Sequence, residues 1–345
     1  MPALPQLYIQ CNPLLDVSAP VEDEFLEKYK LQKGTSYLME DTHKGIFEEL
    51  EQHPNVTYVP GGSGLNTARV AQWIAQTPKS SFVNYVGCVS DDKYGKILKD
   101  AAEKDGVKMY LEYTPKAATG SCAACISGKD RTLVANLSAA NLLSADHMHS
   151  SDVLETLKAC QLYYLTGFTL TIDMNYVLQV AEAARESGGQ FMMNLSAPFL
   201  LQYFRESFDK VAPYLDVIFG NEIEAKALAD AMKWDSASIP ELAKKAATEL
   251  PYSGTRDRLV VFTQGSEPTV YATRSGKTGS VAVQPIAQDA IVDLNGAGDA
   301  FVGGFLATYA MNYSIERCCE VGNYAAGVII QHNGCTYPEK PSISP

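Results

Sequence analysis

One short segment of this sequence combines small residues with a carboxylate in a way that could support phosphoryl chemistry. It reads Gly296, Ala297, Gly298 and Asp299, and an apolar pattern of helical spacing begins at Phe301. Small residues leave backbone N–H groups at a helix start open, so an anion such as a phosphate could bind at the positive end of the helix dipole. A carboxylate at Asp299 could then accept a proton from an attacking hydroxyl. The alternative is a turn in which Asp299 only caps the helix.

A second glycine-rich segment precedes another expected helix. It spans residues 61–69 and reads Gly-Gly-Ser-Gly-Leu-Asn-Thr-Ala-Arg, whereas residues 293–299 read Asp-Leu-Asn-Gly-Ala-Gly-Asp. The two segments resemble the two signatures of the ribokinase-like (pfkB) family of sugar and nucleoside kinases. The resemblance implies that Asp299 is the base that takes the proton from the substrate hydroxyl. It also implies that the backbone of Gly296, Ala297 and Gly298 forms an anion hole for the transferred phosphate.

Other segments are similar to the adenosine kinases within this family, in matching order and spacing from about residue 7 to the end of the chain. They are residues 12–16, 120–125, 194–199, 219–225 and 334–341. The resemblance implies an enzyme of purine salvage that uses Mg²⁺ as cofactor and ATP as phosphate donor. It would transfer the γ-phosphate of MgATP to the 5′-hydroxyl of adenosine, giving AMP and ADP.

The resemblance also assigns a nucleoside site residue by residue. Asp16, Gly62 and Asn66 would hold the ribose hydroxyls, since a carboxylate and an amide together accept and donate hydrogen bonds. The slot for adenine would be formed by Asn12, Leu14, Leu38, Cys122, Leu133, Ala135, Phe168 and Phe199. Ser63 and Asn295 complete the predicted substrate-binding set. For any single aliphatic member, ordinary core packing is the alternative.

ATP and Mg²⁺ are assigned by resemblance to a third group of residues. The predicted ATP-site residues are Asn221, Thr263, Gly265, Gln288, Asn323 and Ala326. Asn221 and Glu224 match the Asn-x-x-Glu element of the family, which would organise Mg²⁺. The alternative is a surface helix cap in which Asn221 and Glu224 form a capping box, and the two roles are compatible.

A charged side chain lies on a predicted hairpin. Residues 120–136 alternate with period two around a turn at residues 127–130, which is typical of two antiparallel strands. On the second arm Arg131, Leu133 and Ala135 share one face. The resemblance implies that Arg131 stands against the transferring phosphate as a catalytic residue. The alternative is a solvated arginine beside a turn.

The elements that must position these groups follow from the rest of the chain. Short apolar runs alternate with helical periodicity, and the candidate strands are residues 7–10, 81–86, 162–165, 191–195, 217–219 and 259–263. This favours an α/β fold with a doubly wound, mostly parallel sheet. Residues 16–63 and 116–136 depart from this alternation of strands and helices and are predicted to form a smaller β-rich lid domain. The large nucleotide-binding domain would comprise residues 1–15, 64–115 and 137–345.

The composition restricts the class of protein, its partners and its compartment. The chain has 345 residues, a formal net charge of −12 and 46% hydrophobic residues, which excludes wholesale disorder. An acidic surface disfavours nucleic acid and anionic membranes as partners, and no apolar run could span a bilayer. The eight cysteines are spread along the chain and are expected to be reduced thiols. We therefore expect a cytoplasmic protein. The resemblance implies that its partners are adenosine and MgATP, and we expect it to be a monomer.

Three positions depart from the family pattern. Cys11 stands where the family usually has glycine. Leu294 replaces the usual threonine, so a hydroxyl role is absent there. The pair Gly64-Leu65 replaces a more polar pair, and the sequence offers no physical account of that change.

Two short patterns suggest metal binding and are given a plainer interpretation. Cys122 and Cys125 form a CxxC, but on a strand residues three apart point to opposite faces. The run Asp146-His147-Met148-His149 is expected to be a solvated loop.

Rival nucleotide-binding motifs are incomplete. A P-loop requires glycine where Tyr271 stands before Gly276-Lys277-Thr278, and neither glycine-rich segment completes a dinucleotide-binding Gly-x-Gly-x-x-Gly. A catalytically inactive nucleoside-binding protein, ribokinase and other nucleoside kinases stay open as alternatives. Asp299 with its anion hole favours an active kinase, and the apolar hairpin favours a flat base over a bare sugar.

Overall fold

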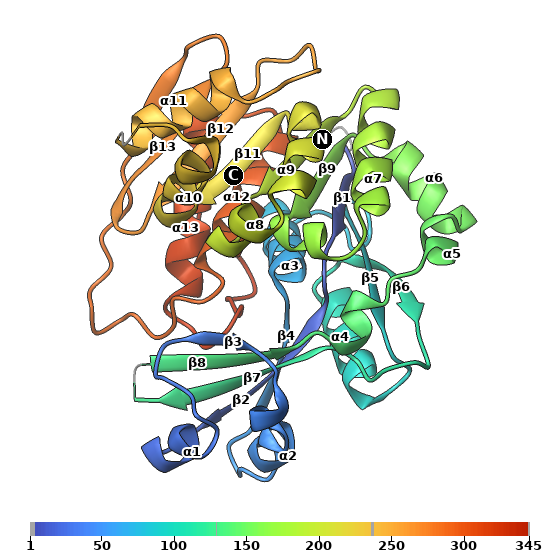
Figure 1. Cartoon of the computed structure of the whole chain (residues 1–345), viewed down its shortest axis with the longest axis vertical. Coiled ribbons are helices and arrows are strands. Elements are labelled where there is room, and N and C mark those ends of the chain that lie inside the picture. Colours follow the sequence, from blue (N-terminus) through green and yellow to red (C-terminus); the bar gives the residue numbers. More distant parts are fainter. Residues whose placement is uncertain (1–3, 129, 236–237, 344–345) are drawn as a thin grey trace.

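A nine-stranded sheet forms the body of the computed structural model, which describes residues 4–128, 130–235 and 238–343 (Figure 1). The strand order is β14-β13-β12-β11-β10-β9-β1-β5-β6. The strands are β1 (Leu7–Gln10), β5 (Val83–Val89), β6 (Lys108–Tyr113), β9 (Leu162–Thr166), β10 (Gln190–Asn194), β11 (Val217–Asn221), β12 (Leu259–Gln264), β13 (Glu267–Thr273) and β14 (Thr278–Val281). Strands β1, β5, β6 and β9 to β12 pair in parallel, and β13 and β14 pair antiparallel. The prediction of a mostly parallel sheet is confirmed.

Helices cover both faces of this sheet, because successive residues of a buried strand face opposite cores. On β1, Leu7 and Ile9 pack into one core and Tyr8 packs into the other. The first core is covered by α3 (Ser63–Ala75), α4 (Lys93–Lys104), α12 (Ala297–Ala310) and α13 (Ile315–Ile329). The second is covered by α5 (Ala145–Met148), α6 (Ser151–Ala159), α7 (Met174–Glu186), α8 (Pro198–Tyr203), α9 (Arg205–Val211), α10 (Glu222–Met232) and α11 (Ile239–Glu249). The body is doubly wound, as predicted.

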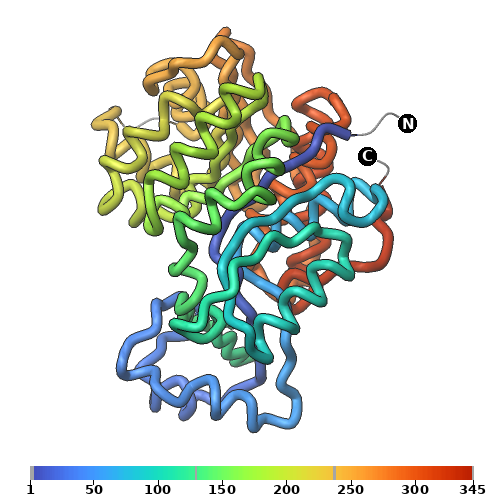
Figure 2. The backbone as a smooth tube through the Cα atoms, turned by 90° about the vertical axis from the view of Figure 1, so that its right-hand side faces the viewer, coloured from blue at the N-terminus to red at the C-terminus, as the bar shows by residue number. Residues whose placement is uncertain are grey.

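A five-stranded sheet of order β3-β8-β7-β2-β4 forms a smaller unit, which we call the lid (Figure 2). Its strands are β2 (Leu14–Pro20), β3 (Ser36–Leu38), β4 (Thr57–Gly61), β7 (Ser121–Ser127) and β8 (Asp130–Asn136). The helices α1 (Asp23–Lys28) and α2 (Ile46–Glu51) pack on one face, around Val17, Ala123 and Val134. The antiparallel hairpin β7–β8 is confirmed, and Lys129 of its predicted turn lies outside the described residues.

The predicted lid segments contain these five strands, except that β2 begins at Leu14, two residues before the predicted boundary. The reason is that β2 already pairs with Gly61 of β4 at that residue. Short 3-10 helices lie in the connections: η1 (Asp41–His43), η2 (Ser138–Asn141), η3 (Gly167–Thr171) and η4 (Ala212–Tyr214).

The carboxyl ends of the parallel strands meet at the edge of the body sheet that faces the lid, since β1 runs directly into β2 (Figure 1). In open α/β sheets ligands bind beyond this edge. The polar residues that end β10, β11 and β12 therefore gather there. Within the described part of the chain, no helix has the length and apolar character needed to cross a membrane.

Candidate active site

Asp299 lies in the first turn of α12, where it meets the first turn of α3. Ser63 Oγ donates a hydrogen bond to Oδ1 of Asp299 at 2.6 Å, and Asn66 Nδ2 donates to Oδ2 at 3.0 Å. Thr67 Oγ1 also donates to the backbone carbonyl of Asp299, at 3.2 Å. The residue that caps α12 is Gly296, so the interpretation of Asp299 as a simple helix cap is excluded.

The environment of the Asp299 carboxyl sets its proton affinity. Burial raises the pKa of Asp299 to about 6, and the hydrogen bonds from Ser63 and Asn66 act in the opposite direction. The group is therefore ionised at neutral pH but is a stronger base than an exposed aspartate. Such a carboxylate suits a general base.

Residues 294–298, which we call the anion loop, lead directly to Asp299. Gly296 adopts a φ of +78°, which favours glycine, and it turns the chain into α12. A Cβ at Gly298 would meet no atom within 4 Å, so the space beside this backbone is open. The first N–H groups of a helix have no partner within it, so an anion could bind them here.

The face of the lid sheet opposite α1 and α2 carries the predicted nucleoside residues. Asp16, Cys122, Ala135 and Leu38 lie directly opposite one another across β2, β7, β8 and β3. Leu14 on β2, and Arg131 and Leu133 on β8, share this face because they are an even number of residues away. The predicted register of the hairpin is confirmed, since Val134 packs into the core on the other face. Cys122 and Cys125 therefore point to opposite faces, and all eight cysteines are free and buried.

Two glycines bring the β4–α3 turn close to β2. A Cβ at Gly61 would lie 2.5 Å from Oδ1 of Asp16, and one at Gly62 would lie 2.3 Å from the carbonyl oxygen of Asn12. Gly62 also has a φ of +88°. A larger residue at Gly62 would meet the backbone, and one at Gly61 would displace the Asp16 carboxylate, so the turn places Asp16 and Asn12 beside α3.

The side chains of Asp16 and Asn12 both place polar atoms in the buried space beside this turn. Burial raises the pKa of Asp16 to about 6, although the guanidinium of Arg131 lowers it. Asn12 Nδ2 donates to Oδ1 of Asn141 at 2.6 Å. Its own Oδ1 is buried and has no hydrogen-bond partner among the described residues, so it is available to a donor on a ligand.

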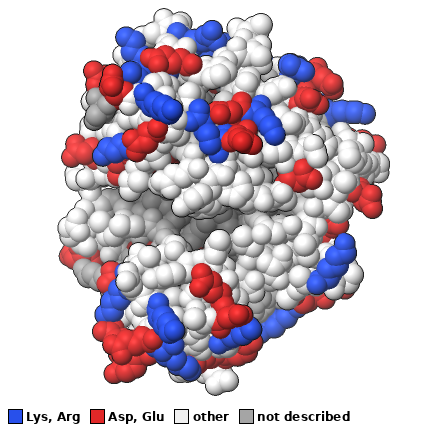
Figure 3. All heavy atoms as spheres, in the orientation of Figure 1, with Lys and Arg blue, Asp and Glu red and all other residues white. Residues whose placement is uncertain are grey.

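Two aromatic rings lie at the same edge of the body sheet. Phe168 in η3 and Phe199 in α8 have ring centroids 6.3 Å apart and planes tilted by 40°. They follow β9 and β10, which are neighbouring strands. Figure 3 shows a hollow between the body and the lid, and the visible side chains around it are mostly uncharged.

Asn221 and Glu224 form the expected capping box at the start of α10. Asn221 Oδ1 accepts from the backbone N–H of Glu224 at 2.8 Å, and Glu224 Oε2 accepts from the backbone N–H of Asn221 at 3.0 Å. The prediction that this cap lies on the surface is wrong, because Glu224 is only 6% exposed. It packs against Gly220, whose missing side chain leaves it room. Burial raises the pKa of Glu224 to about 7.

A small cavity of about 40 Å³ joins the cap to the start of α12. Its polar lining includes Asn194, Asn221, Glu224 and Thr263, and Gly298 closes it. The structure thus brings the predicted metal residues and the anion loop around one space, which has room for a water molecule. Asn194 was not predicted, although its position at the end of a buried strand could have identified it.

The other predicted ATP-site residues lie elsewhere. Gly265 and Gln288 are exposed in connections, and Ala326 is half-buried on α13. Asn323 is buried, and its amide accepts from Thr269 at 2.7 Å and donates to the carbonyl oxygen of Ala282 at 3.4 Å. Because its polar atoms are already hydrogen-bonded within the body, Asn323 could contact a ligand but would not form further hydrogen bonds with it.

Arg131 is buried, so its interpretation as a solvated arginine is wrong. Its Nη1 donates to Oδ2 of Asp293 at 2.5 Å, and its Nη2 lies 3.5 Å from Oδ2 of Asp16. Asp293 was not predicted as a functional residue in its own right. A buried guanidinium needs hydrogen-bond acceptors, but backbone carbonyls can supply them, as they do for the fully buried Arg258, so a buried arginine alone does not identify a carboxylate partner.

Two departures from the family pattern explain each other. A Cβ at Gly64 would lie 2.4 Å from Cβ of Cys11, so the side chain of Cys11 fills the space that a residue at position 64 would need. Cys11 is anchored there by a 2.9 Å contact between its Sγ and Oγ1 of Thr166. Leu294, the third departure, is 67% exposed.

We expect Gly64→Ala to lower the free energy of unfolding by about 1–3 kcal/mol, the usual cost of overpacking. Adding Cys11→Gly should recover most of that loss, because it removes the atom that the new methyl group meets. Urea unfolding of both single variants and the double variant measures the coupling. Strictly additive losses would contradict the explanation.

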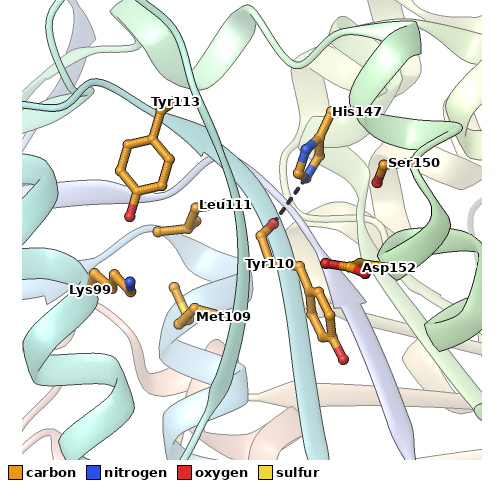
Figure 4. Close-up of a pocket in the computed structure, with 8 residues that line it drawn as sticks. All are labelled: Lys99, Met109, Tyr110, Leu111, Tyr113, His147, Ser150 and Asp152. Carbon is orange, nitrogen blue, oxygen red and sulfur yellow. Dashed lines mark hydrogen bonds between the residues drawn. The ribbon is translucent and has the colours of Figure 1, made fainter.

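A separate cavity of about 290 Å³ lies at the far edge of the body sheet, between α4, β6 and the α5–α6 segment (Figure 4). No predicted site residue lines it. His147 Nε2 lies 3.2 Å from the carbonyl oxygen of Tyr110 across this cavity. The expectation of a solvated loop at residues 146–149 is wrong, because α5 forms there around the buried Met148.

Comparison with known proteins gives a consistent result. A model described as "pfkB family carbohydrate kinase" matches residues 35–342. Adenosine kinase 2 of Arabidopsis thaliana is 40% identical over 333 residues, covering 96% of each chain. Among solved structures, apo adenosine kinase of Trypanosoma brucei brucei is 54% identical with a TM-score of 0.93, covering 96% of this chain and 100% of that one.

A further solved structure, Anopheles gambiae adenosine kinase in complex with P1,P4-di(adenosine-5) tetraphosphate, is 40% identical with a TM-score of 0.90. It covers 98% of this chain and 99% of its own. Both signatures, the sheet order and the lid agree with these matches. The chain belongs to the pfkB family of carbohydrate kinases and, within it, to the adenosine kinases.

Proposed function

We propose that this protein transfers the γ-phosphoryl group of ATP to the 5′-hydroxyl of adenosine, with Asp299 as the general base. One observation carries the proposal. The Asp299 carboxylate is held by Ser63 and Asn66 directly beside the open backbone of the anion loop. A base and an anion site are thus adjacent, as phosphoryl transfer to an alcohol requires.

The nucleoside would lie between the lid face and the β4–α3 turn. Asp16, Gly62 and Asn66 are proposed to hold the ribose hydroxyls. Cys122, Ala135 and Leu38 of the lid sheet are proposed to cover the base. Phe168 and Phe199 supply aromatic surface from the body. This placement would direct the 5′-hydroxyl toward Asp299, because Asn66, one of the proposed ribose residues, donates a hydrogen bond to that carboxylate.

The chemical step is an in-line displacement. The 5′-oxygen forms a bond to the γ-phosphorus while the bond from that phosphorus to the bridging oxygen of ADP breaks. The hydroxyl proton passes to the Asp299 carboxylate. The N–H groups at the start of α12 stabilise the negative charge on the transferred group, and Arg131 adds positive charge from the lid.

The residues at the start of α10 fit a supporting role toward Mg²⁺. Among the described residues no group of three or more His, Cys, Asp or Glu could hold a metal ion, so protein ligands alone do not form a cage. Glu224 presents a carboxylate to the small cavity beside Gly298. Mg²⁺ usually keeps several waters and binds through substrate phosphates, so Asn221 and Glu224 would hold it through water. When bound, Mg²⁺ supplies positive charge to the phosphates.

Glu224→Gln should therefore shift the midpoint of Mg²⁺ activation to a concentration higher by on the order of 10-fold. The free energy of unfolding should change by less than about 2 kcal/mol, because the isosteric amide can still accept from the Asn221 backbone. Mg²⁺ titrations of initial rate, together with thermal unfolding, measure both quantities. An unchanged Mg²⁺ midpoint with a lower melting temperature would leave Glu224 only its capping role.

The raised pKa of Asp299 predicts a pH dependence. The base must be ionised to accept a proton, so kcat/KM should rise with pH and level off above the pKa of Asp299 near 6. The limb should appear in kcat/KM because that ratio reports groups of the free enzyme. Asp16 titrates in the same range, and Glu224 has a pKa of about 7, so both carboxylates contribute to this limb. Rates independent of pH between about pH 5 and pH 8 would exclude a titrating base of this kind.

A direct assay tests the proposed function. Transfer of radiolabelled phosphate from ATP is measured with adenosine, inosine, guanosine and ribose as acceptors. Labelled AMP should form fastest by a wide margin. Preferred labelling of ribose would favour a sugar kinase, and no labelling of any acceptor would favour a nucleoside-binding protein without activity.

We also propose a monomer in the cytoplasm. The eight cysteines are free and buried, which fits a reducing compartment.

A further inference from the structure

Asp293 joins the lid to the anion loop, and we infer that it is a positioning residue that couples nucleoside binding to phosphate binding. The inference rests on the proposed function, because it concerns the two halves of that active site. Asp293 immediately precedes the anion loop, and its side chain is 3% exposed. Asp293 hydrogen-bonds Asn295 and Arg131 of the predicted site, and in this role it acts on the substrates through them.

The two oxygens of the Asp293 carboxylate hold different segments. Oδ1 accepts from the backbone N–H of Asn295 at 2.9 Å and from Asn295 Nδ2 at 2.8 Å. Oδ2 accepts from Arg131 Nη1 at 2.5 Å and from the backbone N–H of Gly334 at 3.1 Å. The Asp293 carboxylate therefore connects the lid, the anion loop and the C-terminal segment. A movement of Arg131 would move Asp293 and, through it, Asn295, the residue before Gly296.

Arg131 carries this connection to the nucleoside side. It lies on the lid face that holds Leu133 and Ala135, and its other terminal nitrogen approaches Asp16 at 3.5 Å. Its Nε is buried and has no hydrogen-bond partner among the described residues, so the contact with Asp293 is its principal anchor. A ligand that orders the lid face should also order the anion loop. By thermodynamic reciprocity, a ligand in the anion loop should strengthen binding at the lid face equally.

The test measures this coupling without turnover. Calorimetry gives the Kd of a non-hydrolysable ATP analogue in the presence of Mg²⁺, with and without saturating adenosine. In the unmodified protein adenosine should tighten analogue binding by about 5-fold or more, the lower end of typical coupling between sites. In Asp293→Asn the factor should fall below about 2-fold, because the amide cannot pair with Arg131 while it still accepts from Asn295.

A second variant and a control keep the result decisive. Arg131→Gln breaks the same contact from the lid and should reduce the factor equally, whether or not Asp293→Asn folds. Asp105→Asn removes the partner of another buried arginine, Arg69, at 2.7 Å, and should cost stability without changing the factor. Absence of coupling in the unmodified protein, or unchanged coupling in Arg131→Gln, would overturn the inference. Failure of adenosine to bind at all would contradict the proposed function instead.

Discussion

Replacing Asp299 by asparagine should lower kcat by at least about 10²-fold, the usual contribution of a positioned base, while the Kd for adenosine stays nearly unchanged. The amide has the size of the carboxylate and can still accept one of the hydrogen bonds from Ser63 and Asn66. It cannot take up the proton of the 5′-hydroxyl. Steady-state kinetics and adenosine calorimetry separate the two effects, since loss of binding would indicate a damaged pocket.

Ser63→Ala is the matched comparison, because it removes one hydrogen bond to the same carboxylate and leaves the base in place. The bond from Ser63 lowers the pKa of Asp299, so its loss should move the acidic limb of kcat/KM to higher pH. The loss of kcat should be smaller than in Asp299→Asn. Wild-type turnover in Asp299→Asn would remove Asp299 from the base role.

Arg131→Ala should lower kcat by on the order of 10²-fold, as for other arginines that stabilise charge in phosphoryl transfer. The guanidinium contacts both Asp16 and Asp293, so its removal leaves two buried carboxylates without this positive partner. Arg131→Lys should recover activity only in part, since an ammonium cannot reach both carboxylates with a planar fork. The measurements are kcat and the KM values for both substrates.

Unfolding must be measured on the same variants, because loss of one partner of a buried ion pair is costly to stability. The partial recovery in Arg131→Lys distinguishes the two causes, since a lysine restores charge at the site. Full activity in Arg131→Ala would show that neither the phosphate nor the anion loop depends on this arginine.

Local patterns allowed most of the fold to be predicted. The strand at residues 7–10 was predicted with its observed bounds, and the hairpin register was predicted because alternation places Val134 in a core and Leu133 outside it. Strand ends were less exact: the strand predicted at residues 81–86 is observed as Val83–Val89. Its continuation depends on pairing with β6, which no local pattern encodes.

Site residues within continuous motifs were also predicted, whereas their partners from distant segments were not. Asp299 and Ser63 each belong to a glycine-rich segment, but their hydrogen bond joins residues far apart in sequence. The burial of Glu224 was not predicted, although Gly220, which leaves space for its carboxylate, lies only four residues earlier near the end of β11. The contact between Arg131 and Asp293 exists only once the lid meets the body.

The order of strands in the two sheets has a consequence for how the chain folds during synthesis. β2 pairs in parallel with β7, so Leu15 cannot pair until Ser121, more than a hundred positions later, has been synthesised. β1 lies between β5 and β9, and its hydrogen-bonding edges stay unpaired until both strands have been synthesised. β1 and β2 are thus synthesised well before the partners that complete their pairing, and pairings this distant form slowly. Their unpaired edges are exposed to other nascent chains meanwhile, so refolding yield should fall as protein concentration rises.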